Sequence, residues 1–83
     1  MSKAKKTRFE LAVIERVIEK RRQLGLTQEY IAEVLGLTQG FVGQIESPKS
    51  ASKYNLNHLN RLAEEMGCSP REFLPDNAVR EDA

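Results

Sequence analysis

The sequence predicts an all-α fold, a single small domain of five helices. Apolar residues recur at spacings of three and four along most of the 83-residue chain, and no segment alternates as a strand would. The run Leu24-Gly-Leu-Thr-Gln28 recurs eleven residues later as Leu35-Gly-Leu-Thr-Gln39. In each copy a glycine ends one helix, a leucine packs into the core, and a threonine caps the next helix.

Residues 1–7 show no apolar pattern and are expected to form a flexible basic arm. The folded domain is expected to follow over residues 8–75. Its first helix is predicted over residues 8–24, with Leu24 on the apolar stripe and Gly25 ending the helix.

The second and third helices are predicted over residues 28–35 and 39–46, on either side of a tight turn at Gly36. The residues that form their buried stripes are Ile31 and Leu35 in the second helix, and Val42 and Ile45 in the third. Two short helices joined in this way have the shape that places a helix in the major groove of DNA.

A polar loop over residues 47–53 separates the third helix from the fourth. The fourth helix is expected to begin after a cap at Asn55 and to end at Gly67. Its predicted apolar stripe comprises Leu56, Leu59, Leu62, Ala63 and Met66.

The segment Ser69-Pro-Arg-Glu72 has the pattern of a capping box with proline at the first helical position. It predicts a short fifth helix through Phe73 and Leu74 that Pro75 ends. Residues 76–83 are expected to form a frayed tail.

The composition gives no support to catalysis or to a metal site. A single cysteine, Cys68, excludes an internal disulfide and a cysteine-built zinc site, and there is one histidine. No nucleophile with a base at a credible spacing and no phosphate-binding glycine loop is present. Charged residues interrupt the stretch after the basic start, so no signal peptide or membrane span is expected. We therefore expect a cytoplasmic protein without a cofactor.

The net charge of +1 conceals a gradient along the chain. Residues 1–22 carry eight Lys or Arg and three Glu, whereas residues 55–83 carry three Arg and six acids. This polarity suits a protein that presents one side to phosphate, although short termini also vary without function.

A set of ordered positions carries a family resemblance: Arg21, Leu24-Gly-Leu-Thr-Gln28, Ala32, Leu35-Gly-Leu-Thr-Gln39, Gln44-Ile-Glu46, Leu62-Ala63 and Gly67. Through them the chain from about Val17 to Pro75 resembles the helix-turn-helix domain of the lambdoid phage repressor and Cro family, also called the XRE family. The resemblance implies a compact five-helix bundle that binds operator DNA as a dimer.

The expected base-reading residues lie on the third helix, opposite its buried stripe. Gln39 and Gln44 can each donate and accept, which suits adenine N6 and N7 in the major groove, and the family reads bases from these positions. Gly40 and Gly43 share this face and would let bare backbone approach the bases, although the family usually carries larger side chains here. The alternatives are two solvated glutamines and a weak recognition surface.

The expected phosphate contacts flank this helix. Gln28 begins the second helix, whose backbone N–H groups suit a phosphate, and in the family this glutamine also braces the residue that corresponds to Gln39. Lys49 is the strongest candidate in the loop, where hydroxyls and lysines are often merely solvated. The full predicted set is Gln28, Thr38, Ser47, Lys49, Ser50 and Lys53. The resemblance further implies a structural ion pair between Arg21 and Glu46.

The resulting hypothesis is a sequence-specific DNA-binding transcriptional regulator that binds as a symmetric dimer, with repression as its expected mode of action. The fifth helix, around Phe73 and Leu74, is the expected dimer contact, unless both side chains are used in the core. The alternative is an antitoxin that binds a protein toxin and regulates its own operon. Only nine residues follow Leu74, which favours the free-standing regulator.

Overall fold

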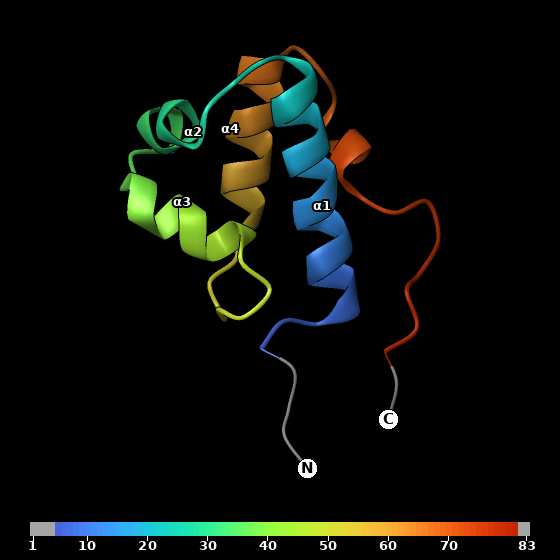
Figure 1. Cartoon of the computed structure of the whole chain (residues 1–83). Coiled ribbons are helices and arrows are strands. Elements are labelled where there is room, and N and C mark those ends of the chain that lie inside the picture. The colour runs from blue at the N-terminus through green and yellow to red at the C-terminus, as the bar shows by residue number, and fades with distance from the viewer. Residues whose placement is uncertain (1–4, 82–83) are drawn as a thin grey trace.

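The helices begin and end at the junctions that the sequence repeats. The computed structural model describes residues 5–81, and in this range it has four α-helices, one 3-10 helix and no strand. The elements are α1 (Arg8–Gln23), α2 (Gln28–Leu35), α3 (Gln39–Glu46), α4 (Leu56–Met66) and the 3-10 helix η1 (Pro70–Phe73). Figure 1 shows α1 and α4 running alongside each other, with α2 and α3 stacked against their flank. The predicted all-α class is confirmed.

Both copies of the repeated junction close in the expected way. Gly36 ends α2 with a φ of 70°, a left-handed conformation that glycine adopts without a steric penalty. Thr27 caps α2 by accepting a hydrogen bond from the Tyr30 amide at 3.0 Å. Thr38 caps α3 through the Phe41 amide at 3.1 Å. Gly36 and the Thr38 cap fix the sharp turn between α2 and α3, and Thr27 fixes the start of α2.

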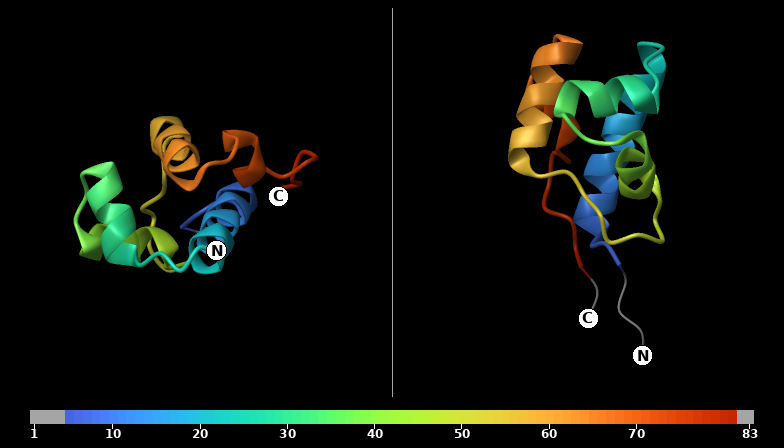
Figure 2. Two further views of the ribbon diagram at one scale, coloured as in Figure 1. Left: turned by 90° about the horizontal axis from the view of Figure 1, so that it is seen from above. Right: turned by 90° about the vertical axis from the view of Figure 1, so that its left-hand side faces the viewer.

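The core forms where the apolar stripes of four helices and η1 meet. Figure 2, seen from above, shows α2 and α3 on one side of this centre and η1 on the other. The largest fully buried side chains are Val17, Ile31, Val42, Ile45, Leu62 and Phe73. Two of them belong to α3, so the inner face of this helix is fixed by the core.

Two leucines that were expected on buried stripes are exposed. Leu24 is 49% exposed because α1 ends at Gln23, and Leu24 then caps the helix in the turn before Gly25. Leu56 is 79% exposed because it is the first residue of α4 and stands at the edge of its stripe. Both lie at helix ends, where the spacing pattern constrains the side-chain direction least.

The fifth helix is shorter and tighter than the sequence predicted. It is one 3-10 turn of four residues, η1, capped by Ser69, whose Oγ accepts from the Arg71 amide at 3.2 Å. Pro75 follows almost at once, so no room remains for a longer α-helix. Phe73 is only 1% exposed, which makes it a core residue and removes it from any dimer contact.

The terminal segments hold defined positions close to the domain. Thr7 caps α1 in a capping box with Glu10, and the Lys6 side chain is buried, so the predicted flexible arm is wrong at these two residues. Glu81, in the expected tail, accepts hydrogen bonds from the amides of Arg8 at 2.8 Å and Phe9 at 2.9 Å. A carboxylate there satisfies orphan N–H groups at the start of α1. Residues 1–4 and 82–83 lie outside the described range.

A buried ion pair joins α1 to the end of α3, as the resemblance implied. Arg21 donates to both carboxylate oxygens of Glu46, from Nε at 2.9 Å and from a terminal nitrogen at 3.0 Å. Its other terminal nitrogen donates to the Leu26 carbonyl at 2.9 Å. The same carboxylate accepts from Gln28 at 2.8 Å. This network, the Arg21–Glu46 cluster, ties three segments together.

Replacing Arg21 with methionine is expected to lower the free energy of unfolding by about 3 kcal/mol or more, because Glu46 would be left as a nearly buried, unpaired charge. The matched control is Arg22→Met, on an exposed neighbour, which should change stability by less than about 0.5 kcal/mol. Urea unfolding followed by circular dichroism measures both. Equal losses in the two variants would contradict a structural role for the pair.

Candidate nucleic-acid interface

The outer face of α3 is polar, exposed and poor in side chains. Gln39, Gly40 and Gln44 are exposed, and Gly43 is half-buried. The opposite face carries Val42 and Ile45, both fully buried, so the outward direction of the other residues is set by the core. In Figure 1 this helix lies at the outer flank of the bundle, with its end leading into the loop after it.

Neither glycine of α3 is required by packing within the domain. A Cβ built on Gly40 would meet no atom within 4 Å, and a Cβ on Gly43 would meet only Gln28 Oε1, at 3.8 Å. Their backbone conformation is helical, not left-handed. The helix therefore presents bare backbone along the middle of its outer face although alanine would fit there and favour the helix.

Gln28 reaches across this face toward the end of α3. Its Nε2 donates to Glu46 at 2.8 Å, and its Oε1 is the atom nearest to a Cβ at Gly43. The side-chain contact expected between Gln28 and Gln39 is therefore replaced by another one. The Gln28 amide nitrogen donates to Glu46 and so belongs to the Arg21–Glu46 cluster. Gln28 adjoins the middle and the end of the outer face of α3.

Gln44 is held from the loop that follows α3. The Ser52 hydroxyl donates to Gln44 Oε1 at 3.3 Å, which orients the side chain of this exposed glutamine. Gln39, at the first position of α3, is exposed beside the Thr38 cap. The two glutamines thus stand at opposite ends of the same face.

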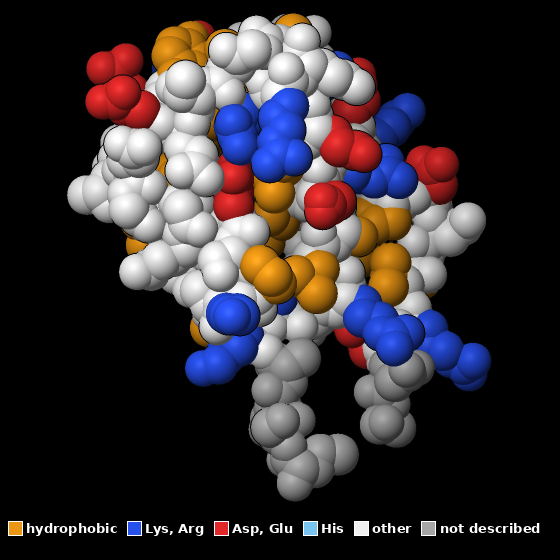
Figure 3. Space-filling model, in the orientation of Figure 1, with side chains coloured by type: hydrophobic (Ala, Val, Ile, Leu, Met, Phe, Trp, Pro, Cys, Tyr) orange, Lys and Arg blue, Asp and Glu red, His pale blue; other side chains and the backbone are white. Residues whose placement is uncertain are grey.

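The loop over residues 47–53 folds back on itself through its hydroxyls. Ser47 Oγ accepts from the Lys49 amide at 3.3 Å, and Ser50 Oγ accepts from the Ser52 amide at 3.1 Å. The Lys49 side chain is exposed at the outside of this turn. Figure 3 shows Lys and Arg side chains near this loop and beside the start of α1, whereas the surface over α3 is largely uncharged.

Lys53, also predicted to bind phosphate, is already paired within the domain. Its ammonium lies 2.6 Å from Glu10 Oε2. The hydrogen bond from Lys53, together with those from Thr7, lowers the pKa of the Glu10 carboxyl below its ordinary value. A phosphate would have to compete with this carboxylate for Lys53.

The structure brings Lys6 to the end of α3 and the loop that follows it. The sequence indicated only that Lys6 is one of several cations in a basic arm. Its Nζ lies among backbone carbonyls at the end of α3 and in the loop, where burial lowers the pKa of the ammonium and nearby Glu10 partly opposes this effect. A lysine followed by a threonine cap carries no local signal for such a contact.

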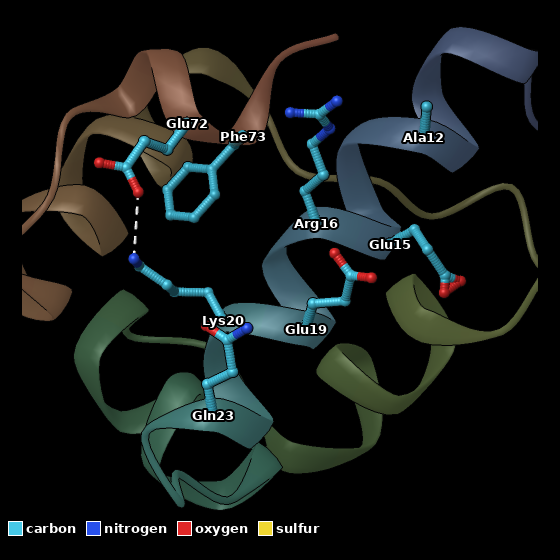
Figure 4. A pocket seen from close by; sticks show the side chains of 8 residues that line it. All are labelled: Ala12, Glu15, Arg16, Glu19, Lys20, Gln23, Glu72 and Phe73. Atoms are coloured by element: carbon cyan, nitrogen blue, oxygen red, sulfur yellow. Dashed lines mark hydrogen bonds and ion pairs between the residues drawn. The ribbon is translucent and has the colours of Figure 1, made fainter.

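A separate charged hollow of about 470 Å³ lies between α1 and η1. Figure 4 shows its walls, where Lys20 and Glu72 form an ion pair at 3.0 Å between the two elements. None of the predicted contact residues lines it. Within residues 5–81, no three side chains of metal-binding type cluster as a metal site would need. None of the helices in this range has the length and apolar character that crossing a membrane requires.

Known proteins share the arrangement of α2 and α3 and of the helices around them. A family model described as helix-turn-helix matches residues 17–73, which hold the end of α1 and all of α2, α3, α4 and η1. A search of curated proteins gave no significant match. The crystal structure of the restriction-modification controller protein C.AhdI from Aeromonas hydrophila is similar, with 31% sequence identity and a TM-score of 0.62. The similarity covers 77% of this chain and 96% of C.AhdI.

Crystal structures of a larger protein contain the same fold. HppE with cobalt(II) and substrate gives a TM-score of 0.68 at 24% identity, covering 81% of this chain and 36% of that one. HppE with iron(II) gives 0.70 at 23% identity, covering 89% of this chain and 38% of that one. At such low identity the likeness shows a shared fold, and it covers little more than a third of HppE.

Alanine at Gly40 or Gly43 is expected to raise the free energy of unfolding by about 1 kcal/mol each, because the added Cβ has room and lowers the entropy cost of the helix. The control is Gly36→Ala, where φ is 70° and the same change should destabilise the fold. Thermal unfolding of the three variants measures this. A loss of stability at Gly40 would contradict the open surface described above.

Proposed function

The chain belongs to the XRE family of helix-turn-helix DNA-binding regulators, and we propose that it is a sequence-specific transcriptional repressor that reads its operator with α3. The observation that carries this proposal is the outer face of α3. Exposed Gln39 and Gln44 stand at its two ends, and a fully buried inner face fixes the direction in which they point. An amide that both donates and accepts can bind adenine N6 and N7 together in the major groove.

The glycines between these two glutamines bring the α3 backbone close to the bases. With no atom beyond Cα, Gly40 and Gly43 allow a closer approach than alanine would. Two glycines in an eight-residue helix cost stability that the internal packing does not explain. Close contact with DNA gives them a function, and it leaves sequence reading chiefly to the two glutamines.

Phosphate contacts around this face would set the register of the protein on the duplex. Lys49 is the main candidate because it is exposed at the tip of the loop. Ser47 and Ser50 lie beside it, and Thr38 lies at the other end of α3. Gln28 adds the positive N-terminal end of α2. Lys53 contributes less, because Glu10 holds its ammonium.

The relative in Aeromonas is a restriction-modification controller, which supports a regulatory role for this chain. The alternative function, an antitoxin that binds a protein toxin, stays a prediction. A toxin-like gene transcribed together with this one would favour it over the free-standing repressor.

A symmetric dimer would double what one short helix reads and would space two half-sites about one helical turn, roughly 34 Å, apart. Because Phe73 is buried, the proposed contact moves to the exposed apolar side chains around a small pocket beside α1 and α4. These are Phe9, Leu56 and Leu74. A two-fold axis through this apolar surface would bury it against its own copy.

Gln39→Ala and Gln44→Ala are each expected to weaken binding to the selected operator by about 1–3 kcal/mol and to leave binding to random DNA nearly unchanged. The operator would first be selected from random duplexes. Lys49→Ala should instead weaken both and make the negative slope of log K against log salt shallower by about 0.9. Equal losses on operator and random DNA in the glutamine variants would show that they do not specify sequence.

Leu56→Glu is expected to abolish dimerisation and to leave a protein that protects one half-site only. The matched control is Leu24→Glu, which changes another exposed leucine outside the proposed contact. Analytical ultracentrifugation with and without DNA measures the oligomeric state of both variants, and footprinting measures which half-sites they protect. A selected site without inverted symmetry, or full protection by the Leu56 variant, would contradict the dimer.

A further inference from the structure

Lys6 differs from its neighbours in the N-terminal segment because its side chain is buried. It is 3% exposed, whereas Lys5 and Thr7 on either side are exposed. Among the described residues, the other buried charged side chain is Arg21, which has the Glu46 carboxylate as its partner. A buried ammonium is costly unless its donors are satisfied, so the groups around Lys6 must serve this purpose.

Three backbone carbonyls surround the Lys6 ammonium. Nζ lies 2.5 Å from the carbonyl oxygens of Ser47 and Ser50 and 3.4 Å from that of Gln44. An ammonium group has three N–H donors and no acceptor. Three carbonyls therefore use all of its donors, and none is left to bind a phosphate oxygen.

Two of these carbonyls belong to the end of α3. Gln44 lies in its last turn and Ser47 is its C-cap, at the negative end of the helix dipole. The Gln44 carbonyl accepts from the Ser47 amide at 3.1 Å and the Ser47 carbonyl from the Ser50 amide at 3.2 Å, so each has a second lone pair for the ammonium. The last turn of α3 has no basic residue of its own. Lys6, 38 residues before Gln44, supplies the missing positive charge from a different part of the chain.

A second contact joins the same two segments in the opposite direction. Lys53, at the end of the loop, pairs with Glu10 in the first turn of α1, while Lys6, just before α1, binds the first half of the loop. Figure 2 shows the start of α1 and the loop after α3 at the same end of the molecule. The position of Lys49 therefore depends on contacts at both ends of its loop.

From these contacts we propose that Lys6 is a positioning residue for DNA binding. Its ammonium locks the end of α3 and the loop over residues 47–50 in the conformation that presents Gln44 and Lys49 to DNA. It does so without touching a phosphate itself, although it lies in a basic arm. The proposal rests on the function proposed above.

The salt dependence of binding separates a positioning lysine from a phosphate contact. Lys6→Met keeps an unbranched side chain, one atom shorter, and removes its charge. It should weaken operator binding by about tenfold or more because the carbonyl cluster loses its donor. The slope of log K against log salt should stay at its wild-type value. In the matched control, Lys49→Met, the negative slope should become shallower by about 0.9.

Two results would overturn the proposal. A slope that becomes equally shallow in Lys6→Met and Lys49→Met would make Lys6 a phosphate contact. Wild-type affinity in Lys6→Met would show that the carbonyl cluster does not matter for binding.

Amide hydrogen exchange in the free protein tests the lock independently of DNA. In Lys6→Met the Ser50 amide should exchange faster, while amides in the middle of α1, such as that of Val17, keep their wild-type rates. Unchanged exchange at Ser50 would contradict the lock even where an operator is bound. If selection yields no operator, the proposed function fails, and this measurement still decides the role of Lys6.

Should Lys6→Met fail to fold, the wild-type protein provides the test. A buried, hydrogen-bonded ammonium exchanges its protons slowly enough to give a nitrogen-15 correlation at room temperature, and the Lys6 signal should persist unchanged when DNA is added. No signal for Lys6 in the free protein, under conditions that reveal protected ammonium groups, would overturn the proposal.

Discussion

The Arg21–Glu46 cluster is the interaction on which the placement of α3 depends. It joins the last turn of α1, the turn before α2 and the last residue of α3 through one bidentate pair and two further hydrogen bonds. Buried ion pairs contribute little net stability compared with apolar residues of the same size, but losing one partner is costly. The cluster therefore serves to specify where α3 ends, a function that hydrophobic contacts, which are not directional, perform poorly.

Because α3 is held at its ends, its middle can remain bare. The Thr38 cap fixes the first turn, and the Glu46 side chain together with the Lys6 ammonium fixes the last. Between them Gly40 and Gly43 weaken the intrinsic preference for a helix, which the buried inner face and the two end contacts offset. In the proposed function the glycines allow the backbone to approach the bases closely, at the cost of side chains that could read the sequence. The contacts at both ends of α3 keep it helical although the centre of its outer face has no side chains.

Features set by local rules could be predicted from the sequence, and those set by long-range contacts could not. The bounds of α2 and α3 and the left-handed Gly36 follow from capping, glycine and spacing rules that act within a few residues. The pairing of Arg21 with Glu46 followed from the family resemblance, since 25 residues separate them. Lys6 looks like any cation in a basic arm, because the carbonyls it binds lie about forty residues further on. The base- and phosphate-contacting roles stay predictions, because they depend on contacts with a duplex and not on contacts within the chain.

Base recognition by α3 through glutamine amides in the major groove can be tested by atomic substitution in the DNA. Each adenine of the selected duplex would be replaced in turn by 7-deazaadenine, which removes the N7 acceptor and leaves pairing intact. We expect a loss of about 1–3 kcal/mol at one or two adenines in each half-site, and no such loss at the same adenines when the Gln39→Ala or Gln44→Ala protein is used. Uniform tolerance of the substitution at every adenine would contradict the claim.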